Sequence, residues 1–104
     1  MAEYSAAEDE FAIHRRTTTA GVPDSVRFAG RRRSAEVVNL SADEGAMLFF
    51  TVDGSVPAVD GPTSYLVVPG GVLEVADTRR ANDTIVRVVS DGAAMYSVTA
   101  APLR

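Results

Sequence analysis

The 104-residue chain has no cysteine, no lysine and no tryptophan, and it has one histidine. Without cysteine it has no disulfide, no thiolate nucleophile and no sulfur ligand for zinc. A single histidine is also too little for a transition-metal site. Asp53 and Asp60 begin two Asp-Gly steps in a predicted loop, but they lack the alternating spacing of an EF-hand and fit ordinary turn chemistry. We therefore expect no metal and no cofactor.

Motifs that would indicate catalysis are missing as well. His14 lies beside Arg15 and Arg16, no serine occupies a G-x-S-x-G turn, and no carboxylate is marked as the partner that would orient the histidine. The 14 acidic residues include no pair that the pattern singles out for glycosidase chemistry. Pro69-Gly70-Gly71 leads into a predicted strand with no lysine after it, which argues against a phosphate-binding loop. The sequence predicts a protein that is not an enzyme.

Long apolar runs are absent too. A helix that crosses a membrane needs roughly 20 predominantly apolar residues, and no segment approaches that length. The opening MAEYSAAEDE is acidic, whereas a secretory signal has a basic start followed by an apolar stretch. We expect no membrane partner and no secretory signal.

The basic residues that are present are all arginines, and several are clustered. Two explanations fit the missing lysine: codon bias in a GC-rich genome, or a preference for arginine in interface ion pairs, where its planar fork binds carboxylates through two hydrogen bonds. We favour codon bias for the composition and keep the interface explanation for the clusters. The candidate protein-contact residues are Arg15, Arg16, Arg31, Arg32, Arg33, Arg79 and Arg80.

The net charge argues against nucleic acid as the partner. Acidic residues in the first twelve positions account for the formal net charge of −4. The Arg31–Arg33 loop has only Phe28 as a nearby aromatic residue, so it lacks the interleaved rings of a groove that stacks bases. An acidic chain also repels a phosphate backbone. We expect a protein partner.

Alternating apolar and polar residues predict short strands along most of the chain. Val26 and Phe28 alternate with polar neighbours, and Val38 and Leu40 share one face of the next strand. The segment AMLFFTV at 46–52 is the most apolar and is expected to be a central strand. The predicted strands cover residues 14–20, 25–28, 35–40, 46–52, 65–68, 72–76, 84–89 and 94–100.

Short strands separated by turn signals predict an all-β fold, a single small antiparallel β-sandwich or barrel that is immunoglobulin-like or jelly-roll-like. Residues 21–104 form this domain, and residues 1–20 are predicted to be an N-terminal arm, extended or partly disordered. The tight connection at 90–93 predicts a hairpin between 84–89 and 94–100. A domain of this size buries a modest core, so self-association or docking would remove more apolar surface from water.

One series of features resembles a known family. A strand ends in Asn39-Leu40, a strand and turn run from Phe49 to Pro57, a second turn spans Tyr65–Gly70, and a closing hairpin spans Ser90–Val98. This order resembles small virion structural proteins of tailed bacteriophages that infect actinobacteria. The resemblance does not include the N-terminal arm.

The resemblance implies a capsid decoration or minor capsid protein that binds the outside of the shell, contacts the major capsid protein or another virion protein, and bridges neighbouring capsid subunits. It also implies location in the virion after assembly in the host cytoplasm, and a homo-oligomer, with a trimer favoured by analogy. One alternative is a tail or neck accessory protein. Another is a β-sandwich module that binds carbohydrate or a host surface. The Thr51–Pro57 turn also resembles a structural turn of modules appended to carbohydrate-active enzymes, although the few aromatic residues make a poor sugar platform.

Overall fold

The computed structural model describes residues 2–77 and 82–102, and this part of the chain folds into nine β-strands with no helix. It therefore contains no helix that is long and apolar enough to cross a membrane. The strands form two sheets that pack face to face, which confirms the predicted all-β sandwich.

The first sheet has five strands. In spatial order they are β1 (Glu3–Ala6), β3 (Asp24–Phe28), β8 (Thr84–Val89), β5 (Leu48–Thr51) and β6 (Tyr65–Val67). All neighbours pair antiparallel except β1 and β3, which run parallel.

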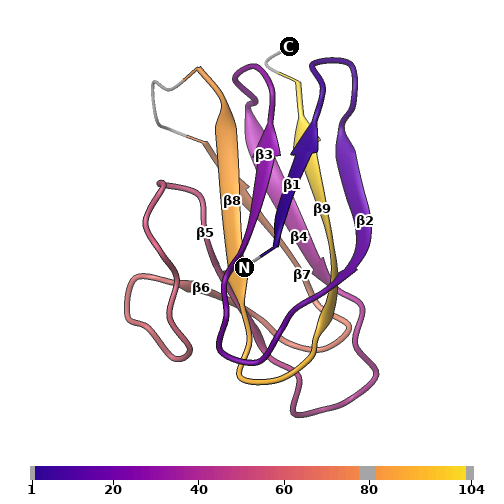
Figure 1. The fold of residues 1–104 in the computed structure, drawn as a ribbon, viewed down its shortest axis with the longest axis vertical. Coiled ribbons are helices and arrows are strands. Elements are labelled where there is room, and N and C mark those ends of the chain that lie inside the picture. Colours follow the sequence, from indigo (N-terminus) through magenta and orange to yellow (C-terminus); the bar gives the residue numbers. More distant parts are fainter. Residues whose placement is uncertain (1, 78–81, 103–104) are drawn as a thin grey trace.

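The second sheet has four strands, all paired antiparallel. In spatial order they are β2 (Ala12–Thr17), β9 (Met95–Ala101), β4 (Ser34–Asn39) and β7 (Val72–Ala76). Figure 1 shows the two layers, with β8, β3 and β1 in front of β4 and β7. Because side chains alternate along each strand, each sheet turns one face to the other sheet and one face to solvent.

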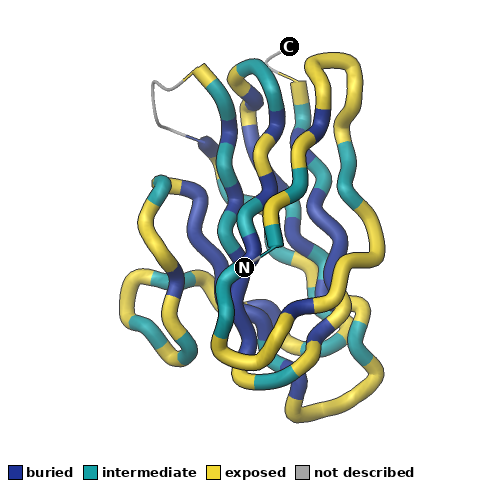
Figure 2. The backbone as a smooth tube through the Cα atoms, viewed as in Figure 1, coloured by how far each residue is buried: buried dark blue, intermediate teal, exposed yellow. Residues whose placement is uncertain are grey.

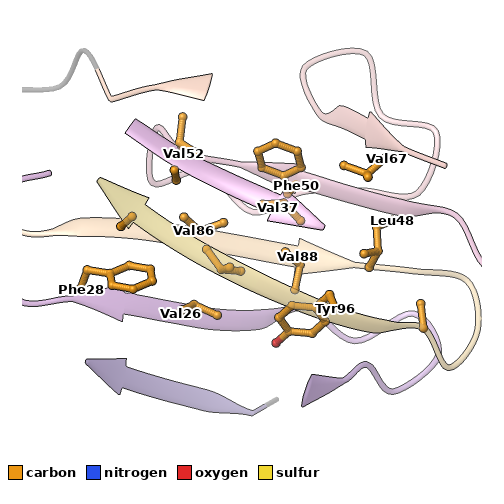
Figure 3. Close-up of a cluster of buried hydrophobic side chains, with 14 of the residues drawn as sticks. Val26, Phe28, Val37, Leu48, Phe50, Val52, Val67, Val86, Val88 and Tyr96 are labelled. Atoms are coloured by element: carbon orange, nitrogen blue, oxygen red, sulfur yellow. The ribbon is translucent and has the colours of Figure 1, made fainter. Parts of the chain in front are cut away.

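The core lies between the sheets and is built from alternate residues of both. Figure 3 shows Val26, Phe28, Val86 and Val88 of the first sheet pointing toward the second sheet, where Val37 and Tyr96 meet them. These side chains are fully buried, and valine at most inward positions suits a pleated, densely packed layer. The fully buried side chains of largest volume are Tyr96, Phe28, Phe50 and Leu48.

Two predictions about individual strands have different outcomes. The most apolar segment forms β5, which is buried along its length and has a neighbour on each side, as expected. The hairpin predicted between β8 and β9 is wrong, because β8 pairs with β3 and β5 whereas β9 pairs with β2 and β4. Both strands direct apolar side chains at the same core, so they face each other across it. Their connection crosses between sheets, and Thr18 fixes it through a hydrogen bond from its hydroxyl to the Gly92 carbonyl.

The N-terminal arm expected over residues 1–20 is not confirmed, since its two strands are edge strands of the sandwich. β1 extends the first sheet and β2 extends the second. Ala6 is buried, and Tyr4 and Ile13 pack against the core from these edges. Only a few apolar residues anchor the segment, which is why its sequence shows little periodicity.

Candidate functional site

The outer face of the four-stranded sheet carries a group of exposed apolar side chains. Because Val37 points into the core, Val38 points outward. The register places Val72 beside Val38, and Leu40 lies beside Met95, whose carbonyl accepts the Leu40 N–H at 2.8 Å. Val72 is 56% exposed, Leu40 42% and Met95 38%. We call Val38, Leu40, Val72 and Met95 the outer apolar cluster.

Apart from two glutamates, the rest of the outer face of β4, β7 and β9 is made of small side chains. The small residues of β4, β7 and β9 on this face are Ser34, Ala76, Ser97, Thr99 and Ala101. Single exposed apolar residues are common on protein surfaces, whereas the members of this cluster lie next to one another across three strands. The face is therefore suited to packing against another surface.

Two carboxylates lie next to the cluster. Glu36 of β4 and Glu74 of β7 are directly opposite each other in the register, and both point outward. The Ser34 hydroxyl donates to Glu74 at 3.2 Å. Neither glutamate has a cation within ion-pair distance in the described part of the chain. Like charges on directly opposed strand positions repel, so this pair attracts a positive group.

A hollow of about 490 Å³ lies on the same outer face, between the cluster and β2. A bulge in β2 shapes its rim: the register shifts between Ile13 and Arg16, and Arg15 has a positive φ of 55°. The Arg15 N–H donates to the Ser97 hydroxyl at 3.1 Å, which holds the bulge against β9. The hollow is lined by His14, Arg15, Glu36, Val38, Leu40, Ser97 and Thr99.

The hollow brings His14 and Glu36 into one lining but shows no arrangement that indicates catalysis. The Ser97 hydroxyl is engaged by the Arg15 backbone, and no hydrogen bond joins His14 to Ser97 or Glu36. Across residues 2–77 and 82–102, no group of three or more His, Asp or Glu is placed to hold a metal ion. Apolar, basic and acidic groups side by side on an open face fit the recognition of another surface.

The predicted contact arginines that the structure describes do not form one site. Arg15 lines the hollow, and Arg16 is exposed with its guanidinium carbon 4.6 Å from the ring centre of Tyr4, a cation–π contact. Arg31 and Arg33 are exposed in the loop between β3 and β4. Arg79 and Arg80 lie outside the described residues. Figure 2 shows that exposed residues gather in the loops and along β1 and β2.

Arg32 is buried, so its prediction as a surface contact is wrong. It is 2% exposed, and its guanidinium donates to the backbone carbonyls of Ala7, Glu8 and Ala29. Its guanidinium carbon lies 5.1 Å from the ring centre of Phe11 and 5.3 Å from that of Phe28. Nη1 of Arg32 has no hydrogen-bond partner. The buried positive charge is therefore stabilised by the two aromatic rings and by the three backbone carbonyls. Arg32 ties the β1–β2 connection to the end of β3.

An ion pair fixes the start of the same arginine loop. Asp83 accepts hydrogen bonds from the Arg27 guanidinium and, at 2.9 Å, from the Gly30 N–H. These two donors hold the pKa of the Asp83 carboxyl below its usual range. Gly30 has a φ of 77°, a conformation that favours glycine. The loop that presents Arg31 and Arg33 is therefore anchored at its base.

Most residues of this candidate site were not identified from the sequence. The sequence places Val38 and Leu40 on a common face, but nothing in it marks that face as the outer one. The signal that could have found it is the apolar run Val37-Val38 together with Val72-Leu73, since a strand with apolar residues on both faces exposes one of them unless another layer covers it. Glu36 and Glu74 carry no local motif, because only strand pairing brings them together.

Comparison with known proteins reveals a shared fold but no family. No family model matches the chain, and no curated protein sequence matches it. Among solved structures, a carbohydrate-binding module from a sugar cane soil metagenome, CBM_E1 in complex with cellopentaose and gadolinium ion, is 14% identical, with a TM-score of 0.56 over 96% of this chain and 92% of that one. PliG of Aeromonas hydrophila, a periplasmic lysozyme inhibitor of g-type lysozyme, is 8% identical, with a TM-score of 0.54 over 95% of this chain and 97% of that one.

A designed protein also shares this fold. A de novo designed double-stranded β-helix is 13% identical and has a TM-score of 0.55 over 86% of this chain and 96% of that one. At such identities the likeness shows the fold alone, and one fold hosts many functions. The function has to be argued from the surface of this chain.

Proposed function

We propose that this chain is a non-enzymatic virion protein that docks onto another protein through the outer apolar cluster, most simply as a capsid decoration or minor capsid protein. The observation that carries the docking proposal is the outer apolar cluster, in which the exposed Leu40, Val72 and Met95 surround the partly buried Val38 on one sheet face. The virion assignment is supported by the order of sequence features that resembles phage structural proteins.

The physical argument for docking rests on buried apolar area. Covering apolar surface contributes about 25 cal/mol per Å², and the cluster offers three side chains that are more than one third exposed. Small residues around them let a partner approach the sheet closely. The partner we propose is the major capsid protein, with a second virion protein of the tail or neck as the alternative within the same class.

Self-association belongs to the same proposal. A chain of 104 residues buries a modest core, so an oligomer on the shell would gain stability from further burial. A trimer is proposed by analogy with decoration proteins that occupy local threefold positions.

The carbohydrate-binding alternative has the fold in its favour, because a carbohydrate-binding module shares it. The surface of this chain gives it less support. Sugar rings stack on exposed aromatic side chains, and the large aromatic residues that are clearly exposed in the described residues are Phe11 and Tyr65. Phe11 contacts Arg32, whereas Tyr65 contacts Phe50 with ring centres 5.3 Å apart, so the two do not share a platform.

Binding to purified particle components tests the proposal. The purified chain is mixed with shells assembled from the major capsid protein of the same phage, with purified tails, and with cello-oligosaccharides. We expect saturable co-sedimentation with the shells. Saturable binding to tails alone would move the protein to the tail or neck, and binding to the oligosaccharides without binding to either particle component would contradict the proposal.

A further inference from the structure

The free edge of β7 presents backbone groups that no strand of the described chain pairs with. β7 is the last strand of its sheet, next to β4. At its two ends, the Asn39 N–H donates to the Gly71 carbonyl and the Asp77 N–H donates to the Arg33 carbonyl. Hydrogen-bonded positions alternate along an antiparallel pair, so Leu73 and Val75 face β4 with their backbone groups. The N–H and C=O groups of Val72, Glu74 and Ala76 therefore point away from the sheet.

The other edge strands are protected in ways that β7 is not. β2 has a bulge at Arg15 and exposed arginines, and β1 has only four residues. β6 has three residues, and the carbonyl of its Val67 accepts the Asn39 side chain at 3.0 Å. β7 has five residues in uninterrupted register with β4. Bulges, charges and short length are the usual devices that stop a strand edge from pairing, and β7 has only one charge.

The core side of β7 is also incomplete. Leu73 and Val75 point inward and pack against the core, but both remain half-buried, and no strand of the described residues lies beyond β7. A further strand at this edge would cover them. It would also extend the outer face, so that its own outward residues lie beside Val72 and Glu74.

The charges of Glu36 and Glu74 indicate which side chain the added strand carries beside them. A residue opposite Glu74 would lie about 5 Å away, with Glu36 one strand further at about 10 Å, since neighbouring strands are about 4.8 Å apart. Arginine or lysine at that position would neutralise two carboxylates that now repel each other. A second copy of β7 centred on Glu74 would instead place two more carboxylates together, so a two-fold pair of this kind is disfavoured.

From these observations we propose that β7 binds an extended segment of a partner protein by strand addition, with a basic side chain opposite Glu74 and apolar side chains opposite Val72, Leu73 and Val75. Main-chain hydrogen bonds give such complexes their affinity, and alternate side chains give them specificity. The inference rests on the proposed function in one respect, namely that the partner is a protein.

Selection from a random peptide library on the immobilised full chain tests the inference without a known partner. We expect enrichment of peptides in which arginine or lysine is surrounded by apolar residues. Glu74→Pro removes an outward N–H, which an edge strand tolerates, and should weaken the selected peptides at least tenfold. Glu44→Pro is the matched control. Glu44 is the second residue of the Asp43–Ala46 turn, a position where proline fits, and this substitution removes one negative charge just as Glu74→Pro does.

A charge reversal separates the basic preference from strand addition itself. Selection on Glu74→Arg should enrich acidic peptides in place of basic ones. Circular dichroism and thermal unfolding confirm that each variant is folded. The inference is overturned if no peptide is enriched, if selected peptides bind Glu74→Pro as well as Glu44→Pro, or if the selected peptides are not basic. Binding to capsid shells is measured separately. If peptides are selected as expected but the chain does not bind shells, the proposed function fails; if the chain binds shells but no basic peptide is selected, the strand-addition inference fails.

Discussion

The Tyr96 hydroxyl donates a 2.8 Å hydrogen bond to the carboxylate of Asp24, joining β9 of one sheet to β3 of the other inside the sandwich. Tyr96 is fully buried and Asp24 nearly so. A buried carboxylate without its donor is costly, so the pair is a strong link between the layers. We expect Tyr96→Phe to lower the free energy of unfolding at pH 7 by about 1–3 kcal/mol, measured by urea unfolding.

The same pair makes stability depend on alkaline pH. Burial, and next the hydrogen bond to Asp24, raise the pKa of Tyr96 above its usual 10.0. The unfolded chain loses this proton near pH 10 while the folded chain keeps it, so the contribution is complete below pH 10 and the free energy of unfolding falls above it by about 1.4 kcal/mol per pH unit. Tyr96→Phe should remove that part of the decline, whereas Tyr65→Phe, at an exposed position, should retain it. Parallel pH profiles for Tyr96→Phe and the wild type would contradict this account.

Arg32 should behave as a core residue and not as a contact residue. Arg32→Met removes the donors to three backbone carbonyls, and we expect a loss of about 2–3 kcal/mol in the free energy of unfolding. Arg31→Met and Arg33→Met, at exposed positions in the same loop, should change stability by less than about 0.5 kcal/mol. Equal effects of all three substitutions in thermal unfolding would show that the burial of Arg32 is not important.

Asn39 joins three segments through one buried amide. Its Nδ2 donates to the carbonyls of Ala46 at 2.7 Å and Val67 at 3.0 Å, and its Oδ1 accepts the Ser41 N–H. Asn39→Ala leaves two carbonyls without a donor, so we expect a loss of about 2–4 kcal/mol. Hydrogen exchange measured by mass spectrometry should show faster exchange in β6 and in the 41–47 loop. Unchanged exchange in both segments would contradict the role of this amide.

Deletion of residues 1–20 should unfold the sandwich or destabilise it strongly, because it removes an edge strand from each sheet. It also removes the backbone carbonyls of Ala7 and Glu8, which are two of the three carbonyls that accept hydrogen bonds from Arg32. Circular dichroism and thermal unfolding of the truncated chain measure this. A truncated chain that is as stable as the full chain would restore the view of this segment as a detachable arm.

The fold class could be predicted from the sequence because it depends on local alternation. Val26 and Phe28 show the period of two that a half-buried strand imposes, and the segments that became β4, β7 and β8 are short runs rich in valine between turn signals. Which strands pair depends on long-range contacts that alternation does not encode. The β8–β9 connection looks like a hairpin for that reason, although its two strands lie in different sheets.

The candidate site was harder to predict for related reasons. Arg32 sits between two exposed arginines, and only the carbonyls of Ala7, Glu8 and Ala29, brought together by the fold, make it a buried residue. The outer apolar cluster likewise exists only through the register of β4 with β7 and β9. A pattern of residue types indicates a strand, but it does not say which face another layer covers.

The affinity of the chain for assembled shells, measured with substitutions in the outer apolar cluster, tests the central claim most directly. Leu40→Ser with Val72→Ser removes two exposed apolar side chains, and at about 1 kcal/mol or more for each lost burial we expect binding to weaken at least tenfold. Val56→Ser changes a valine that is 63% exposed and lies elsewhere on the surface, and it should bind like the wild type. Shell binding by the folded double variant that equals the binding of Val56→Ser would contradict the claim that this face docks the chain.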